Sequence, residues 1–121
     1  MGWYRGGDSY GAFCGTNTVS GKGFSLGLST NYSFYCGSVN TGAASSVSVS
    51  NTWAHVVATR QDGVASVYEN GKLLGSGANA TSIVDGGSLA FGYRQYDGAQ
   101  SYQGHLALWR ISATAPTAAQ I

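Results

Sequence analysis

Side-chain polarity alternates with a period of two along most of this sequence, and glycine-containing turn signals interrupt the alternation at short intervals. A period of two places successive side chains on opposite faces of a β-strand. Many short strands separated by turns roughly every 8–12 residues are typical of a β-sandwich or barrel. The sequence therefore predicts an all-β fold of antiparallel strands. The expected strands are 2–5, 9–15, 23–29, 32–39, 45–50, 52–60, 64–69, 72–76, 87–94 and 102–111.

Two dipeptides mark the sharpest turns. Asn70-Gly71 separates two expected strands, and Asp62-Gly63 separates the pair before it. A type I′ hairpin turn needs positive φ at both central residues, which Asn, Asp and Gly tolerate best. We therefore expect tight hairpins at both places and a further hairpin at 30–31. The only helix signal is a capping-box pattern from Thr117 to Gln120.

The scarcity of charge limits the kinds of partner. Only 9% of the 121 residues are Asp, Glu, Lys or Arg, against roughly 25% in a typical soluble domain. The six Lys and Arg residues are scattered singly and the net charge is +1, so nucleic-acid binding is not expected. No run of about 18 apolar residues occurs, so membrane insertion is not expected either. We expect one domain, 1–121, located extracellularly or on a virion surface, where low charge also permits assembly.

The two cysteines fall on the first and third strands of an expected three-stranded meander. Cys14 lies in strand 9–15 and Cys36 in strand 32–39. Two strand spacings are about 9.6 Å, which exceeds the roughly 7 Å between Cα atoms that a disulfide can span. We therefore expect free, mostly buried thiols. Two cysteines without a Cys/His cluster do not predict a zinc site.

Acidic side chains are too few and too scattered for glycoside hydrolysis. The one glutamate, Glu69, lies at an expected hairpin tip, and the four aspartates lie in loop-like contexts. A glycosidase needs two carboxylates that face each other across the bond that breaks, and no two acids fall two apart on an expected strand. Asp85 and Asp97 flank strand 87–94 and are weak candidates for a calcium site. We expect no other cofactor.

Nucleophilic catalysis is not indicated either. His55 and His105 lie within expected strands, and no serine occupies a Gly-x-Ser-x-Gly turn between a strand and a helix. By alternation His55 shares a face with Trp53, Val57 and Thr59, and we expect it to be partly buried there. The sequence therefore predicts a protein that is not an enzyme.

Aromatic rings beside small polar groups are the most abundant potential binding groups. Tyr and Trp offer flat apolar area with a polar rim, which suits stacking on sugar rings or anchoring a protein partner. We interpret Trp3, Trp53 and Trp109 as core residues because each lies in an alternating strand. For Tyr96 and Asn79, binding and packing are equal alternatives. The candidate ligand-binding residues are Tyr93, Arg94, Tyr96, Asp97, Gln100 and Asn79.

Longer motifs carry a family resemblance. Residues 53–59 read W-x-H-V-x-x-T, residues 68–71 read Y-x-N-G, and residues 102–111 read Y-x-G-x-L-x-x-x-R-I, with Gly92 in the strand between. This series resembles the laminin-G-like, concanavalin A-like jelly-roll modules, and the closing "RISATAPTAAQI" is similar to the tails of such modules in phage virion and bacterial surface proteins. The resemblance implies an antiparallel two-sheet jelly-roll sandwich.

The resemblance also implies strands that have no counterpart in this sequence. In the family, one or two strands precede the strand that reads Met-Gly-Trp, which opens this chain. A jelly roll pairs early strands with late ones, so we expect strand 102–111 to keep an open edge with Leu106, Leu108 and Trp109 uncovered. Open edges pair with other chains. The sequence therefore predicts self-association or completion by a partner strand.

These observations lead to one expected function with two alternatives. We expect a non-catalytic recognition or assembly module on a virion or cell surface, which binds carbohydrate if it has a small ligand. Its expected partner is a glycan or a protein surface. The first alternative is a structural decorating or self-assembling subunit without a small ligand. The second is a remnant domain of a carbohydrate-active enzyme.

Overall fold

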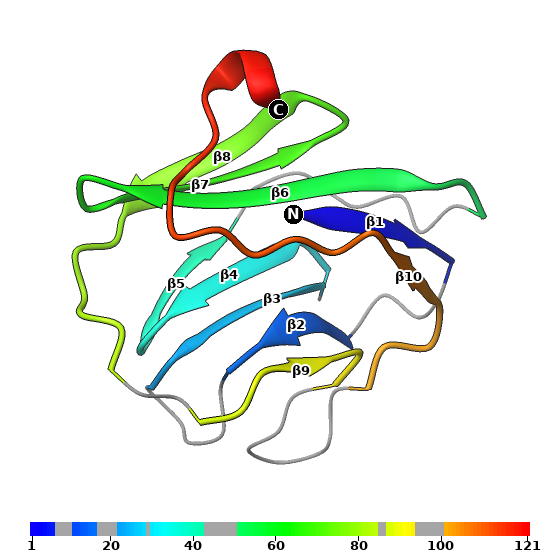
Figure 1. The fold of residues 1–121 in the computed structure, drawn as a ribbon, viewed down its shortest axis with the longest axis horizontal. Coiled ribbons are helices and arrows are strands. Elements are labelled where there is room, and N and C mark those ends of the chain that lie inside the picture. The colour runs from blue at the N-terminus through cyan, green and yellow to red at the C-terminus, as the bar shows by residue number, and fades with distance from the viewer. Residues whose placement is uncertain (7–10, 17–21, 29, 43–50, 85–86, 94–100) are drawn as a thin grey trace.

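The computed structural model describes residues 1–6, 11–16, 22–28, 30–42, 51–84, 87–93 and 101–121. These residues form two five-stranded sheets, and every pair of neighbouring strands is antiparallel. Figure 1 shows the two sheets stacked. The buried apolar side chains come from both sheets and form the core between them. The structure therefore confirms the predicted all-β sandwich.

The first sheet, sheet A, has the strand order β10-β1-β6-β7-β8. β6 (Ala54–Gln61) is the central strand and pairs with β1 (Gly2–Arg5) on one side. β7 (Val64–Glu69) and β8 (Lys72–Ala78) extend the sheet on the other side. β10 (His105–Ala107) pairs with β1 and is an edge strand. The predicted edge position of the last strand is confirmed.

The second sheet, sheet B, has the order β5-β4-β3-β2-β9. β2 (Gly11–Gly15), β3 (Phe24–Leu28) and β4 (Tyr32–Cys36) form the predicted meander. β5 (Val39–Gly42) and β9 (Ala90–Phe91) are its two edges. Consistent with the expectation from this strand order, the two cysteines are free and buried.

The predicted type I′ hairpins are confirmed by their backbone angles. Asp62 and Gly63 have φ of 50° and 74°, and Asn70 and Gly71 have φ of 48° and 82°. Both pairs place positive φ at the two central residues, as that turn requires. These turns fix the register of β6, β7 and β8, and so determine which side chains of the three strands face the core.

Several expected strands end earlier than the alternation suggested, because single residues adopt positive φ. Gly37 has φ of 60° and ends β4, so the expected strand 32–39 is a hairpin whose second arm is β5. Gly92 and Leu108, with φ of 78° and 53°, end β9 and β10. The expected strand 45–50 lies outside the described residues. β5 is not among the expected strands because Gly37 turns the chain within a stretch that reads as one strand.

The expected apolar strip at the β10 edge is mostly covered. Leu106 and Trp109 are half-buried and pack against the core. Leu108 alone is exposed, at 83%. The expectation that all three side chains are uncovered is therefore wrong for two of them. Trp109 is covered because β10 ends at Ala107 and Leu108 adopts positive φ. The indole packs against Phe13, with ring centroids 5.7 Å apart.

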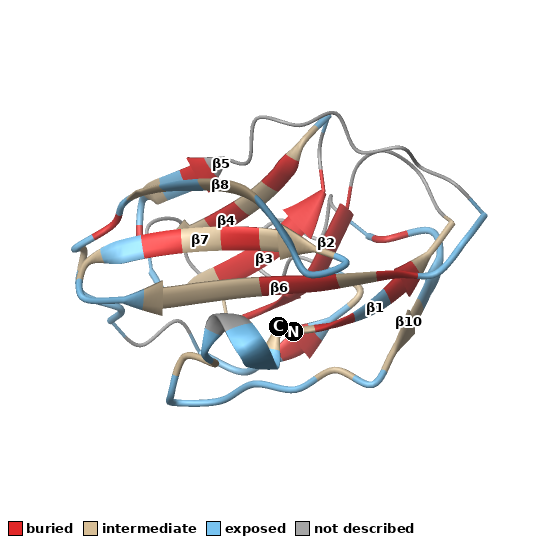
Figure 2. Cartoon of the chain, turned by 90° about the horizontal axis from the view of Figure 1, so that it is seen from above, coloured by how far each residue is buried: buried red, intermediate tan, exposed pale blue. Residues whose placement is uncertain are grey.

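The core between the sheets is rich in aromatic rings. Figure 2 shows buried residues on strands of both sheets. Phe13 is completely buried and stacks on Tyr4, with ring centroids 4.9 Å apart. Tyr102 meets Phe13 edge to face at 5.0 Å. Such ring pairs add packing energy beyond the area that they bury. The buried cluster comprises Tyr4, Phe13, Cys14, Leu26, Leu28, Tyr32, Phe34, Cys36, Ala54, Val56, Ala65, Val67 and Tyr102.

The C-terminal end forms one short 3-10 turn, η1 (Ala118–Gln120). The backbone N–H of Thr117 donates to Oε1 of Gln120 at 2.9 Å. In the predicted capping box, this is the contact in which the Gln120 side chain accepts from the backbone N–H of Thr117. Among the described residues, no helix is long and apolar enough to cross a membrane.

Candidate functional site

Aromatic and cationic side chains gather on the outer face of sheet A. Tyr4 is buried, so alternation along β1 turns its neighbours Trp3 and Arg5 outward. The ladders place Trp3 opposite His55 of β6 and Arg5 opposite His105 of β10. Trp53 lies immediately before β6 and completes the group. We call this group the aromatic face; its members are Trp3, Arg5, Trp53, His55 and His105.

The rings of the aromatic face lie close together. The Trp3 and His55 ring centroids are 5.0 Å apart with planes inclined by 32°. The Trp53 and His105 centroids are 6.3 Å apart. The guanidinium carbon of Arg5 is 5.3 Å from the Trp53 centroid, within the range of a cation–π contact. The result is a connected aromatic surface whose side chains come from three neighbouring strands and from Trp53, directly before one of them.

The interpretation of all three tryptophans as core residues is wrong for two of them. Trp3 is 37% and Trp53 is 42% exposed, whereas Trp109 packs against the core as expected. Alternation does place Trp53 and His55 on one face, but it does not say which face is covered. An exposed indole leaves apolar area in water and is therefore informative about binding.

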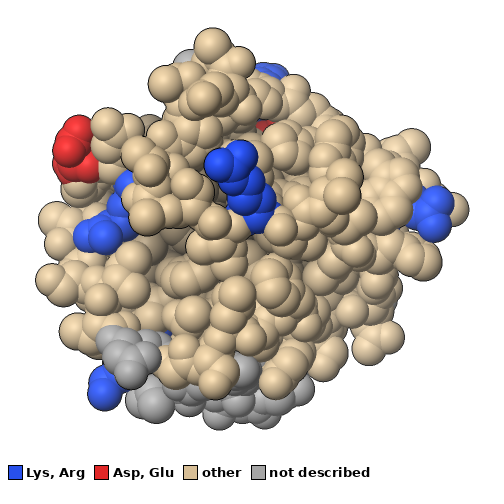
Figure 3. Space-filling model, in the orientation of Figure 1, with Lys and Arg blue, Asp and Glu red and all other residues tan. Residues whose placement is uncertain are grey.

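Charge on and near the aromatic face is sparse. Burial lowers the pKa of His55, and the positive charge of the N-terminus lowers it further. The imidazole beside Trp3 is therefore neutral at pH 7. Arg5 forms no ion pair within the described part of the chain, and its Nε atom is shielded from solvent without a hydrogen-bond partner there. Figure 3 shows that charged side chains are also few and separate on another side of the molecule.

A buried polar network joins the two sheets. The Tyr4 and Tyr32 hydroxyl oxygens are 2.5 Å apart, and both hydroxyls donate to Oε1 of Glu69. Glu69 follows buried Ala65 and Val67 at two-residue spacing, so its side chain points inward from the end of β7. Glu69 was expected at a hairpin tip, and its position next to Asn70-Gly71 does not indicate that the carboxylate points into the core. The network ties β1 and β7 of sheet A to β4 of sheet B.

Burial controls the ionisation of this interior. It raises the pKa of Tyr4 to about 12, and it raises that of Tyr32 further, helped by the hydrogen bond to Glu69. Burial also raises the pKa of Tyr102 to about 12 and that of the Cys14 thiol to about 11. These groups are therefore neutral at pH 7 and act as packing and hydrogen-bonding groups rather than as nucleophiles.

The candidate ligand-binding residues fall in different places. Tyr93 is 44% exposed and follows the end of β9. Asn79 is only 1% exposed, and its Nδ2 donates to Oγ1 of Thr41 at 3.3 Å and to the Val39 carbonyl at 3.4 Å. This side chain fastens the end of β8 to β5, so a ligand in solvent would not reach it. Arg94, Tyr96, Asp97, Gln100 and the calcium candidate Asp85 lie outside the described residues and stay predictions.

Metal-ligating side chains do not converge in the part of the chain that the structure describes. No three His, Cys, Asp or Glu residues there lie close enough together to hold an ion. Two of the five acidic residues are described. Asp62 is exposed in the β6–β7 turn, and Glu69 is bonded to the two tyrosines. The aromatic face is therefore the main candidate for recognition among the described residues.

Two stacked antiparallel sheets with this strand order define a concanavalin A-like β-sandwich. The sequence profile of the concanavalin A-like lectin/glucanases superfamily matches residues 4–121, and the chain belongs to this superfamily. The match confirms the resemblance seen in the motifs. No curated protein matches the chain closely enough to serve as a relative.

Proposed function

We propose that this domain is a non-catalytic recognition module, displayed on a virion or cell surface, that binds carbohydrate through the aromatic face. The observation that carries the proposal is the pair of exposed indoles, Trp3 of β1 and Trp53 directly before β6, which lie beside His55, His105 and Arg5. Membership of a superfamily that includes lectins makes carbohydrate the first ligand class to test.

The chemistry of the aromatic face suits a sugar ring. An indole offers a flat apolar surface to the C–H side of a pyranose, while its polar surroundings offer hydrogen bonds to the hydroxyl groups. Arg5 supplies N–H donors only, and neutral His55 can donate from one ring nitrogen and accept at the other. Because Trp3, His55 and His105 are mounted on paired strands and Trp53 directly precedes β6, little conformational entropy is lost when they bind.

The placement of the two carboxylates that the structure describes supports a role without catalysis. Hydrolysis of a glycosidic bond needs two carboxyl groups on either side of it. Glu69 lies inside the sandwich and accepts hydrogen bonds from Tyr4 and Tyr32. Asp62 lies in the β6–β7 turn and is not a member of the aromatic face.

A glycan array, followed by titration of the best oligosaccharide, tests the proposal. We expect Trp53→Ala to weaken binding by about tenfold or more, equivalent to roughly 1.4 kcal/mol, because the more exposed of the two indoles is lost. Leu73→Ala is the matched control. Leu73 is 50% exposed and, as the ladder partner of Tyr68, lies on the same outer face of sheet A but on strand β8. Loss of binding in both variants, or no binding to any glycan, would count against the proposal.

Assembly is the second candidate function, and Leu108 is the observation that favours it. This residue directly follows edge strand β10, is 83% exposed and has φ of 53°. Left-handed backbone costs a branched aliphatic residue about 1–2 kcal/mol, and an open edge with an exposed leucine suits pairing with a second copy.

Sedimentation of wild type and Leu108→Asn separates assembly from a monomeric recognition module. Asparagine tolerates this backbone conformation and removes the apolar anchor. If the β10 edge mediates assembly, the wild type forms concentration-dependent oligomers and Leu108→Asn is a folded monomer. A wild-type protein that remains monomeric at all concentrations would rule this candidate out.

A further inference from the structure

The permanent positive charge of the aromatic face is carried by Arg5. This residue is the last of β1 and lies at the end of that strand farther from Met1. Its ladder partner is His105 of β10, and its guanidinium carbon is 5.3 Å from the Trp53 ring centroid. Arg5 therefore holds a cation against the rings that we propose to bind sugar.

The two described carboxylates do not neutralise this cation. Glu69 accepts hydrogen bonds from Tyr4 and Tyr32 inside the sandwich, and Asp62 lies in the β6–β7 turn. Within the described part of the chain, Arg5 has no ion pair, and its Nε atom is shielded from solvent without a hydrogen-bond partner. Arg5 is half-buried, and a charge in partly apolar surroundings attracts an opposite charge more strongly than one in open water does.

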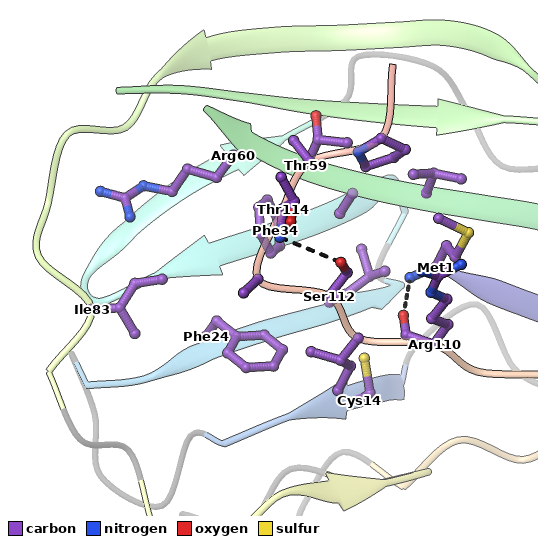
Figure 4. A pocket seen from close by; sticks show the side chains of 17 residues that line it. Met1, Cys14, Phe24, Phe34, Thr59, Arg60, Ile83, Arg110, Ser112 and Thr114 are labelled. Carbon is purple, nitrogen blue, oxygen red and sulfur yellow. Dashed lines mark hydrogen bonds between the residues drawn. The ribbon is translucent and has the colours of Figure 1, made fainter. Parts of the chain in front are cut away.

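The other two described arginines serve a different part of the domain. The guanidinium of Arg60 donates to the backbone carbonyls of Asn79 and Thr81 at 2.7 and 2.6 Å, so its hydrogen bonds hold the chain that follows β8. Arg60 and Arg110 both line a cavity of about 330 Å³, to which no member of the aromatic face contributes (Figure 4). Among the described arginines, Arg5 is thus the one placed to meet a ligand of the aromatic face.

The position of Arg5 suits a charged group at the edge of a sugar ring. The side chains of Trp3 and Arg5 leave the same face of β1 two residues apart, which is about 7 Å along a strand. A pyranose that lies against the Trp3 indole therefore has its ring substituents within reach of the guanidinium. The guanidinium is planar, and its paired N–H groups match the two oxygens of a carboxylate. A uronic acid carries such a carboxylate directly on its pyranose ring.

We propose that the aromatic face is selective for acidic sugars, with Arg5 binding the carboxylate of a uronic acid and the indoles of Trp3 and Trp53 contacting its ring. The inference rests on the proposed carbohydrate binding and names its ligand class. His55, neutral at pH 7, exchanges hydrogen bonds with sugar hydroxyl groups. Arg5 sets the specificity, because a neutral sugar leaves its charge unpaired.

The charge distribution favours a single carboxylate over a highly charged polymer. The net charge of the chain is +1, and its six Lys and Arg residues are scattered singly along the sequence. A heavily sulfated glycan binds through many cations at once, and that kind of attraction is screened by salt. One guanidinium beside one indole instead selects a planar anion by its geometry.

Calorimetric titration with matched sugars tests the proposal. The probes are oligosaccharides of glucuronic, galacturonic and mannuronic acid, each paired with its carboxyl-reduced form, in which a primary alcohol replaces every carboxylate. For the pair that binds best, we expect the acid to bind about tenfold or more tightly than the reduced form, because one hydrogen-bonded charge pair is gained. Arg5→Met should remove this preference while the reduced form still binds, and Arg5→Lys should keep part of it.

Lys72→Met is the matched control, because Lys72 is an exposed cation on strand β8 of the same sheet. This variant loses the same charge as Arg5→Met and should keep the preference for the acid. Arg5→Gln replaces Arg5→Met if the latter does not fold. Asp8 is the acidic residue nearest to Arg5 in the sequence and lies outside the described residues, so Asp8→Asn is titrated as well and should bind as the wild type does.

Three results would overturn the selectivity for acidic sugars. The first is equal binding of each acid and its reduced form by the wild type, and the second is loss of the preference in Lys72→Met as well as in Arg5→Met. The third is a preference that only Asp8→Asn shows, because Asp8 would then be the partner of Arg5. If Trp53→Ala still weakens binding in these cases, carbohydrate recognition by the aromatic face stands. Absence of binding to every oligosaccharide would overturn both.

Discussion

Phe13→Ala is expected to lower the free energy of unfolding by about 3–5 kcal/mol, because it removes a fully buried ring and leaves a cavity. Phe13 stacks on Tyr4 and meets Tyr102 edge to face, so two favourable ring pairs disappear together. Small domains have only about 5–15 kcal/mol of stability in total. Urea denaturation followed by circular dichroism measures the change.

Phe91→Ala is the matched control for this prediction. Phe91 is also a phenylalanine of sheet B, on β9, but its ring is 46% exposed. We expect a loss of less than about 1 kcal/mol, since the ring is already largely in water. Equal losses for the two variants would mean that the sandwich does not enclose Phe13 as described.

Alkaline pH is expected to destabilise the protein strongly. Burial holds the pKa of Cys14 at about 11 and those of Tyr4 and Tyr102 at about 12, above their ordinary values of 9.0 and 10.0. The folded chain therefore keeps protons that the unfolded chain releases, and stability falls as pH rises. The stabilisation is complete below pH 9 and is lost between about pH 9 and 12.

Each such group lowers the free energy of unfolding by about 1.4 kcal/mol per pH unit between its ordinary pKa and its pKa in the folded protein. After allowance for partial solvent screening, we expect a total loss of about 3 kcal/mol between pH 8 and 11. Urea denaturation at a series of pH values measures the loss of stability, and tyrosinate absorbance recorded in parallel measures the ionisation of the tyrosines. Tyr32→Phe removes one of the raised groups and should reduce the slope. Ionisation of all the tyrosines near pH 10 without loss of stability would contradict the account.

The fold could be predicted from the sequence where local chemistry decides the backbone. Asn70-Gly71 and Asp62-Gly63 specify their turns by themselves, and β7 between them has the predicted bounds. β5 was missed because Gly37 turns the chain inside what looked like one strand. β9 and β10 were overestimated because alternation continues in sequence after the ladder has ended.

The candidate site was harder to predict because it depends on how the sheets stack. Alternation separates Trp3 from Tyr4, yet only the packing of sheet B on sheet A shows that Tyr4 is inside and Trp3 outside. Glu69 points inward for the same reason, although its sequence context suggests a solvent-exposed turn.

The most direct test of recognition through the aromatic face is an NMR titration that follows the three indole N–H signals. With the best oligosaccharide from the array, the signals of Trp3 and Trp53 should shift in proportion to saturation. The signal of Trp109, whose indole nitrogen is shielded from solvent, should stay unchanged and serves as an internal control. Binding that leaves Trp3 and Trp53 unperturbed would contradict the account.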